Sequence, residues 1–179
     1  MRIISGKYKG RRLPVAKNLK ARPTTDRAKE SLFNILNNLI DFEAITVLDL
    51  FGGTGGISYE FASRGCKDIS IVEKNYNHIQ YIKENSRQFD FGLKIIKSDV
   101  FKYLKNTQQK FDIIFADPPF DMKNIEDIPK IIFDNKLLNK NGMLILEHSD
   151  LFEFNDKLKP TNTRHYGKVC FSFFNIIEL

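Results

Sequence analysis

The chain has 179 residues, of which 42% are hydrophobic and 28% are charged, and its formal net charge is +6. This length predicts one domain of ordinary size, and the composition excludes a disordered chain, a collagen-like repeat and a disulfide scaffold. No apolar run approaches the ~20 residues of a membrane span, and no apolar segment follows the basic N-terminus as it would in a secretory signal. Because Cys66 and Cys170 are the only cysteines and neither has metal-ligand spacing around it, we expect reduced thiols, a cytoplasmic protein and no bound metal.

The excess positive charge lies in the first thirty residues. Residues 1–30 contain ten basic and two acidic side chains, a balance of +8, whereas the rest of the chain contains 18 basic and 20 acidic ones, a balance of −2. Such an arm is either a solvated tail or a contact for a polyanion, because clustered Lys and Arg release counterions at phosphates. Interleaved Gly and Pro residues disfavour a membrane-surface helix. Apolar residues among the charges favour an ordered arm: Ile3, Ile4, Tyr8, Leu13 and Val15.

Hydrophobic periodicity predicts a helix that begins near residue 25, where Thr25 or Asp26 can cap its N-terminus. Short apolar runs rich in β-branched residues are typical of buried parallel strands. In chain order, we expect helices over residues 25–39, 55–64, 75–87, 100–104 and 125–133. We expect strands over residues 45–50, 68–73, 93–96, 111–116 and 142–147.

Strand and helix alternate from residue 45 to residue 147. This order predicts an α/β fold with a mostly parallel, doubly wound sheet and helices on both faces. Residues 163–166 and 169–177 form either one long strand or a hairpin, and they predict an antiparallel strand at the C-terminal edge of the sheet. We expect a basic arm and helix over residues 1–40 and a sheet domain over residues 41–179, together one compact unit.

A glycine-rich turn, DLFGGTGG over residues 49–56, follows the first predicted strand. In an open α/β sheet this turn borders the crevice where ligands bind, and a carboxylate about 20 residues on can hold ribose hydroxyls, as Glu73 could here. Ser58 replaces the third small residue of a dinucleotide fingerprint, and no Lys follows the glycines as in a P-loop. Asp49 would repel a pyrophosphate. It suits the sulfonium and amino acid groups of S-adenosylmethionine better than NAD or ATP.

A second motif, Asp117-Pro118-Pro119-Phe120, follows the fourth predicted strand. Proline cannot continue a central strand, so the motif must lie at the carboxyl edge of the sheet, facing the same crevice. The two prolines could simply end the strand above a buried Phe. Alternatively, they give a stiff loop with exposed acceptors beside a ring on which a base can stack.

The DPPF motif resembles the [N/D]-P-P-[Y/F/W] motif of amino-group methyltransferases that use S-adenosylmethionine. More narrowly, five segments resemble the bacterial RsmD family: MRIISGKYKGRRL at the start, RPTTDRAKESLFNIL over residues 22–36, VLDLFGGTGG, DIIFADPPF, and LILEHS over residues 144–149. The resemblance implies a Rossmann-like class I methyltransferase that modifies the exocyclic N2 of one guanine in 16S ribosomal RNA. Gly52 and Gly56 stand where the family usually has Ala, which should only loosen the turn, and Phe120 stands where Tyr is common.

The resemblance also implies roles for individual residues. The methionine end of the cofactor would contact Asp49 and the backbone of Phe51, Gly53 and Gly55, with S-adenosylhomocysteine as the product. Glu73 would bind the ribose, and Asp99 and Val100 would contact the adenine. Around the guanine, Asp117 and the Pro118 carbonyl would accept from N2, and Phe120 would stack on a base taken out of its helix, with Pro119 completing the motif. The RNA phosphates would be bound by basic residues of the arm and first helix: Arg2, Lys7, Lys9, Arg11, Arg12, Arg22 and Arg27.

Other targets are compatible with the same motifs. DPPF alone also permits methylation of DNA adenine or cytosine, or of a protein glutamine, although the last would not need the basic arm. A non-catalytic RNA-binding assembly factor is a third alternative, which the intact set Asp49, Glu73 and Asp117 disfavours. We expect a monomer that acts on 16S rRNA, the small ribosomal subunit or an assembly particle. We expect His78 to be exposed on a helix. His148 follows the fifth predicted strand and either has only a strand-end role or contacts the substrate, while His165 is a candidate phosphate contact.

Overall fold

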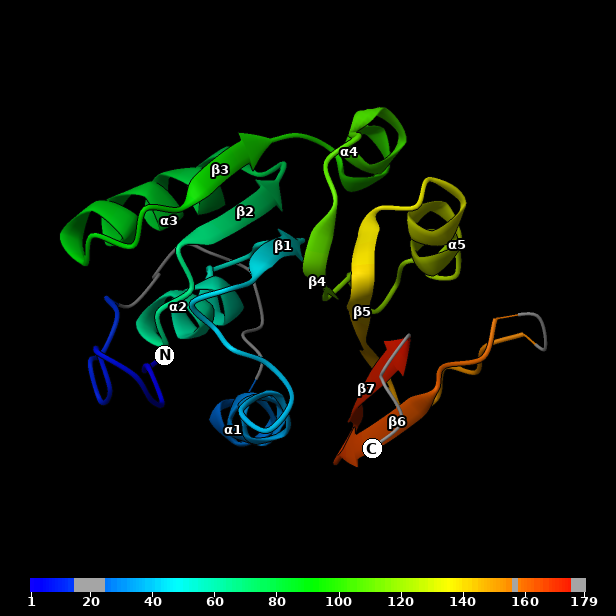
Figure 1. The fold of residues 1–179 in the computed structure, drawn as a ribbon, viewed down its shortest axis with the longest axis horizontal. Coiled ribbons are helices and arrows are strands. Elements are labelled where there is room, and N and C mark those ends of the chain that lie inside the picture. The colour runs from blue at the N-terminus through cyan, green and yellow to red at the C-terminus, as the bar shows by residue number, and fades with distance from the viewer. Residues whose placement is uncertain (15–24, 156–157, 175–179) are drawn as a thin grey trace.

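The computed structural model describes residues 1–14, 25–155 and 158–174 of the chain. They form a seven-stranded sheet in the order β3-β2-β1-β4-β5-β7-β6, with helices packed against both faces (Figure 1). The strands are β1 (Thr46–Leu50), β2 (Asp68–Glu73), β3 (Lys94–Lys97), β4 (Phe111–Ala116), β5 (Leu138–Ser149), β6 (Asn162–Tyr166) and β7 (Val169–Phe174). The helices are α1 (Asp26–Leu36), α2 (Gly56–Ser63), α3 (Tyr76–Gln88), α4 (Val100–Asn106) and α5 (Asp127–Asp134).

Strand β1 lies at the centre of the sheet and pairs in parallel with β2 on one side and β4 on the other. The chain proceeds outward from β1 through β2 to β3, and then crosses to β4 and β5 on the opposite side. Ligands bind beyond the carboxyl ends of the strands at such a reversal of strand order. The topology therefore places the first strand–helix turn and the end of β4 at one crevice, as the alternation of elements predicted.

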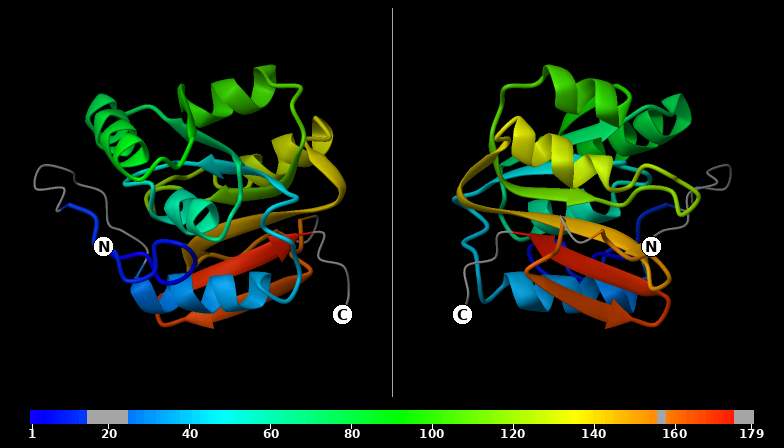
Figure 2. Two further views of the ribbon diagram at one scale, coloured as in Figure 1. Left: turned by 60° about the vertical axis from the view of Figure 1, so that its left-hand side comes forward. Right: turned by 90° about the vertical axis from the view of Figure 1, so that its right-hand side faces the viewer.

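Two apolar cores cover the two faces of the sheet. Successive strand residues point to opposite faces, so Val47 packs with α1 and α2, while Leu48 packs with α4 and α5. Figure 2 shows α1 on the opposite side of the sheet from α4 and α5. Helix α1 contributes Leu32, Phe33 and Leu36 to the first core, and Thr25 caps it by accepting from the backbone N–H of Ala28.

The C-terminal part of the sheet is more elaborate than the sequence indicates. Strand β7 pairs antiparallel with both β5 and β6, so the hairpin alternative is correct. The predicted antiparallel edge strand, residues 169–174, lies inside the sheet, and β6 forms the edge. Residues 175–177, predicted to extend this strand, lie outside the described residues. Strand β5 also begins at Leu138, four residues before the predicted start, because a register shift against β4 admits the extra residues.

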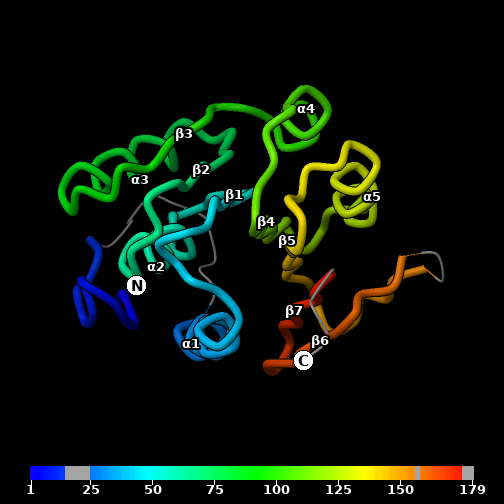
Figure 3. The backbone as a smooth tube through the Cα atoms, in the orientation of Figure 1, coloured from blue at the N-terminus to red at the C-terminus, as the bar shows by residue number. Residues whose placement is uncertain are grey.

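The first fourteen residues fold back on themselves and pack beside α2 (Figure 3). The backbone N–H of Ile3 donates to the Arg11 carbonyl at 2.9 Å, and Ile3 and Leu13 are 1% and 4% exposed. They share a small apolar cluster with Tyr59 of α2. The prediction of an ordered arm is thus confirmed for residues 1–14, whereas Val15 lies outside the described residues. Within the described ranges, the helices are all too short or too polar to cross a membrane.

Candidate functional site

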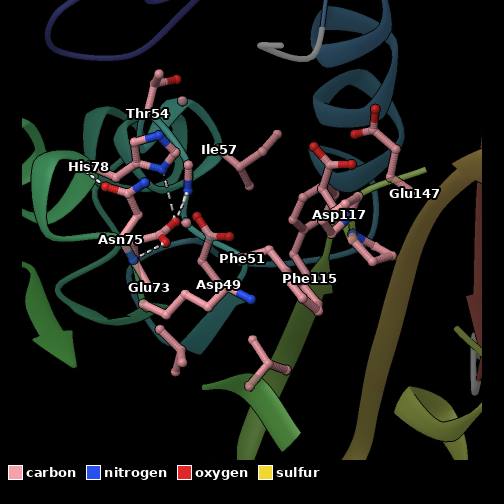
Figure 4. Close-up of a pocket in the computed structure, with 18 of the residues that line it drawn as sticks. Asp49, Phe51, Thr54, Ile57, Glu73, Asn75, His78, Phe115, Asp117 and Glu147 are labelled. Atoms are coloured by element: carbon pink, nitrogen blue, oxygen red, sulfur yellow. Dashed lines mark hydrogen bonds and ion pairs between the residues drawn. The ribbon is translucent and has the colours of Figure 1, made fainter. Parts of the chain in front are cut away.

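A cavity of about 680 Å³ opens at the carboxyl ends of β1, β2 and β4. It lies at the reversal of strand order, and both sequence motifs contribute to its wall. Figure 4 shows Asp49, Glu73 and Asp117 around this space, from three neighbouring strands. The parallel sheet thus brings together carboxylates that are up to 68 positions apart in the sequence.

The glycine-rich turn needs its glycines for two physical reasons. Gly53 and Gly55 have φ angles of 53° and 79°, in the left-handed region that favours glycine. Gly52 has no such angle, but a Cβ there would lie 2.7 Å from Cγ2 of Ile71. That Gly52 and Gly56 only loosen the turn stays a prediction. A Cβ at Gly56 would lie 2.7 Å from Sδ of Met1, an atom of a flexible side chain.

Asp49 is buried at the base of the turn, with 2% of its surface exposed. The Ser58 hydroxyl donates to Asp49 Oδ2 at 2.6 Å. Burial raises the pKa of Asp49 to about 7; the hydrogen bonds from Ser58 oppose this shift, and the nearby Glu73 adds to it. A carboxyl group of this kind gains its charge readily when a cation binds beside it.

Glu73 ends β2 and is held in place by three groups of the chain. Its Oε2 accepts from the Gly53 N–H at 2.8 Å and lies 3.3 Å from His78 Nδ1, while its Oε1 accepts from the Asn75 N–H at 2.7 Å. A carboxylate offers about four lone-pair sites, so acceptor capacity remains chiefly on Oε1. The prediction that His78 is exposed is wrong: its side chain is 14% exposed, because the first turn of α3 faces the end of β2.

On the far side of Glu73, Asp99 and Val100 line the cavity where β3 leads into α4. Asp99 caps α4, since its Oδ1 accepts from the Lys102 N–H at 3.2 Å, and its side chain is exposed. Val100 is 5% exposed. One acceptor and one apolar side chain therefore lie together there.

The DPPF motif begins directly after β4 and lines the same cavity. Pro118 is buried, Pro119 is exposed, and the Phe120 ring is half exposed at 50%. The interpretation of Phe120 as a buried strand terminator is thus ruled out. Burial raises the pKa of Asp117 well above its usual range, and the neighbouring carboxylates of Glu147 and Asp49 raise it further.

Two buried charged residues of the cavity, Glu147 and Lys29, were not singled out in the sequence. Glu147 is 3% exposed and follows Leu146, which pairs with Ala116 across β4 and β5. It thus lies beside Asp117. Lys29 is 2% exposed and forms an ion pair with Glu60 at 3.1 Å. Glu147 lies in the apolar stretch LILEHS, where its charge was the available signal, whereas Lys29 stands next to Glu30 in AKESLF, which gives no such signal.

The basic residues predicted to contact RNA differ in their surroundings. Arg2 is exposed but its Nε lies 3.0 Å from Asp26 Oδ2, in an ion pair. Arg22 lies outside the described residues. The others have exposed side chains: Lys7, Lys9, Arg11, Arg12 and Arg27.

The remaining histidines and cysteines lie away from the cavity wall. His148 is 3% exposed, and its ring nitrogens lie 2.8 Å from the Ser149 carbonyl and the Ser172 hydroxyl. It is the last residue but one of β5 and does not line the cavity. His165 on β6 is exposed and contacts the Cys170 thiol at 3.0 Å. Cys66 and Cys170 are both free and buried. In the described ranges, no group of three or more His, Cys, Asp and Glu side chains is arranged to hold a metal ion.

The strand order, the glycine-rich turn and the acidic residues at the ends of β1, β2 and β4 define the fold of S-adenosylmethionine-dependent methyltransferases. Within this class, the chain belongs to the RsmD family, since the model of the family described as Conserved hypothetical protein 95 matches residues 1–175. The family resemblance found in the sequence is thus confirmed.

One named relative and two solved structures illustrate what this chain is similar to. Ribosomal RNA small subunit methyltransferase D of Haemophilus influenzae is 32% identical over 152 residues, which cover 82% of this chain and 78% of the relative. The structure of a hypothetical protein of Thermus thermophilus has a TM-score of 0.83 at 25% identity, with 97% of this chain and 98% of that chain covered. Coclaurine N-methyltransferase, solved with N-methylheliamine and SAH, has a TM-score of 0.56 at 26% identity, with 72% of this chain and 38% of that chain covered.

Proposed function

We propose that this protein transfers a methyl group from S-adenosylmethionine to the exocyclic N2 of a guanine in 16S ribosomal RNA. The observation that carries the proposal is the position of Asp117 and Phe120, an acceptor and a half-exposed ring, on the wall of the cavity that Asp49 and Glu73 also line. The relative named ribosomal RNA small subunit methyltransferase D supports RNA as the target. The exposed basic residues of the arm supply the matching charge.

The residues around the glycine turn fit S-adenosylmethionine. A buried carboxyl group, Asp49, is suited to the positive charge of the sulfonium and amino groups, and the turn leaves no Cβ at Gly53 and Gly55 to obstruct a ligand. Oε1 of Glu73 has capacity for a ribose hydroxyl, and Asp99 with Val100 offers an acceptor and an apolar contact to an adenine. When bound, the cofactor supplies a methyl carbon that leaves sulfur, with the bonding pair staying on sulfur as S-adenosylhomocysteine, while the lone pair of the guanine nitrogen forms the new bond.

The residues of the DPPF motif prepare the nitrogen for this displacement. The lone pair of an exocyclic amine is delocalised into its ring, so two acceptors aimed at its hydrogens favour a pyramidal nitrogen. Asp117 and the Pro118 carbonyl are such acceptors, and Phe120 holds the base by stacking. The methylated nitrogen is a strong acid, so its proton passes to the Asp117 carboxylate or to water without a stronger base.

The proposed function is tested by methyl transfer to RNA that lacks the modification. Tritiated S-adenosylmethionine is incubated with naked small-subunit RNA, assembly particles and whole subunits from a strain without the gene, and nucleosides are identified by mass spectrometry. We expect label in N2-methylguanine. Label in adenine, in cytosine or in a protein glutamine would favour the other targets, and binding of RNA without cofactor binding would favour an assembly factor.

Asp117→Ala should lower the transfer rate at least 100-fold, because an aligned acceptor is lost. Cofactor affinity, measured by calorimetry, should stay within about threefold, since Asp117 follows β4 and not the glycine turn. Asp121→Asn is the matched control, because Asp121 is exposed and does not line the cavity. Loss of cofactor binding in the Asp117 variant would instead assign that residue to the cofactor.

We further propose that the protein acts as a cytoplasmic monomer on the ribosomal RNA.

A further inference from the structure

Glu147 lies beside Asp117 as a consequence of strand register. Ala116, the last residue of β4, pairs with Leu146 of the parallel strand β5, so the residue that follows each of them in the chain is acidic: Asp117 and Glu147. Both line the cavity, and Figure 4 shows the two carboxylates next to each other. The charge of Glu147 acts on Asp117, which is consistent with their close approach.

Each carboxylate has acceptor capacity for a ligand. An ionised carboxylate only accepts hydrogen bonds, and its two oxygens offer about four lone-pair sites, so it can accept from several donors at once. Two adjacent carboxylates also repel each other. A ligand that presents several N–H groups in a row relieves that repulsion, whereas one that presents a lone pair adds to it.

The edges of the candidate substrates differ in this respect. Guanine presents the N1–H and both hydrogens of its 2-amino group side by side. Adenine and cytosine place an unprotonated ring nitrogen beside their amino group, and a glutamine amide places its carbonyl there. A base that is taken out of its helix is read by hydrogen bonds along this edge. The wall formed by Asp117 and Glu147 therefore matches guanine and repels the other three.

We propose that Glu147 selects guanine by accepting a hydrogen bond from N1–H, while Asp117 holds the 2-amino group that receives the methyl group. This assignment rests on the proposed function, and it adds a residue that determines which base is accepted. It also explains why an acidic residue interrupts the apolar run of β5, since Glu147 is 3% exposed.

The test uses 2-aminopurine, which keeps the 2-amino group but carries a lone pair on N1. Once nucleoside analysis has identified the methylated guanine, small-subunit RNA is prepared by ligation with guanine or 2-aminopurine at that position. We expect the wild-type protein to methylate the guanine RNA about 100-fold faster or more, because a site built for a hydrogen bond strongly rejects a substrate that lacks it. In Glu147→Gln, the side-chain amide can donate to the N1 lone pair, so this ratio should fall at least tenfold. Glu153→Gln is the matched control, because Glu153 is exposed and outside the cavity, and it should keep the wild-type ratio.

The outcomes separate this inference from the proposed function. No transfer to guanine in any RNA or particle would overturn the proposed function itself. Equal wild-type rates on guanine and 2-aminopurine would overturn the role of Glu147, and this measurement needs no variant to fold. An unchanged ratio in Glu147→Gln, or equal loss on both RNAs with normal cofactor binding, would likewise contradict selection by Glu147.

Discussion

The amino group of Lys29 lies 3.1 Å from Oε1 of Glu60, in an ion pair whose side chains are 2% and 0% exposed. The pair joins α1 to α2, and it holds the arm as well. Lys29 Nζ donates to the Arg2 carbonyl at 2.7 Å, and Glu60 Oε1 accepts from the Ile4 N–H at 2.6 Å. Arg64 completes the group by pairing with Glu60 Oε2. The arm is therefore fixed to the body by buried charges as well as by apolar contact.

Replacing Glu60 should destabilise the protein strongly. In Glu60→Gln, Lys29 and Arg64 remain buried without a carboxylate, and we expect the free energy of unfolding to fall by about 3–5 kcal/mol. Lys29→Met should cost less, because Arg64 still balances Glu60. Urea denaturation of both variants measures the difference. Lys94→Met is the control, since it breaks an exposed pair with Asp68 (58% and 40% exposed) and should cost at most about 1 kcal/mol. Equal losses in Glu60→Gln and Lys94→Met would contradict a structural role for the buried group.

The arm also depends on Gly6. Its φ angle is 81°, and a Cβ there would lie 1.9 Å from the Ser63 carbonyl oxygen, where α2 ends. Gly10 has a similar φ of 78°, but a Cβ there would meet nothing within 4 Å. Gly10→Ala should therefore cost only the left-handed conformation, roughly 1 kcal/mol. Gly6→Ala should have the same cost and should also displace the arm from α2. We therefore expect trypsin to cleave the Gly6→Ala variant within residues 1–14 much faster than the Gly10→Ala variant. Equal cleavage rates would show that contact at Ser63 does not hold the arm.

Most of the sheet could be predicted from the sequence, because buried parallel strands are short, apolar and interrupted by helices. The bounds predicted for β2 and β4 agree with the structure, and so does their arrangement around one crevice. Asp49, Glu73 and Asp117 line one cavity for the same reason: each ends, or nearly ends, a neighbouring parallel strand.

The missed residues depend on contacts between distant segments. Lys29 was counted only as one charge of the arm, and its burial follows from the packing of α1 against α2. Glu147 became a neighbour of Asp117 through the register of β4 and β5, which local periodicity does not specify. His78 was misjudged because a polar helix predicts exposure, whereas its first turn faces Glu73.

The buried Asp49 should make stability depend on pH. Its pKa is about 7 in the folded protein, against 3.8 for an exposed Asp, so the folded state binds more protons between these pH values. Below about pH 4, the raised pKa of Asp49 therefore adds at most about 4 kcal/mol to the free energy of unfolding. This contribution is lost as the pH rises to about 7. Asp49→Asn removes the titrating group. In urea denaturation, the free energy of unfolding of this variant should therefore fall less between pH 4 and pH 8 than that of the wild type. Asp121→Asn should follow the wild type, because Asp121 is exposed. Parallel pH curves for wild type and Asp49→Asn would contradict the raised pKa.

The exposed basic residues of the arm should account for much of the salt dependence of RNA binding. Lys9, Arg11 and Arg12 are suited to phosphates because they are exposed, whereas Arg2 already pairs with Asp26. Replacing all three by Gln should reduce the slope of log affinity against log salt by about 2–3, roughly 0.7–0.9 for each lost phosphate contact. The affinity for small-subunit RNA should be measured by filter binding between about 50 and about 200 mM salt, a range over which such contacts have a large effect.

A charge-matched control separates this local effect from the loss of net charge. Lys110, Lys136 and Lys140 are exposed near the amino ends of β4 and β5, at the edge of the sheet opposite the cavity. Their replacement by Gln removes the same three charges, but it should leave the salt slope nearly unchanged, because phosphate contacts and not distant charges determine it. If both triple variants changed the slope equally, the arm would act only through the overall charge of the protein. If neither did, the phosphates would be bound elsewhere.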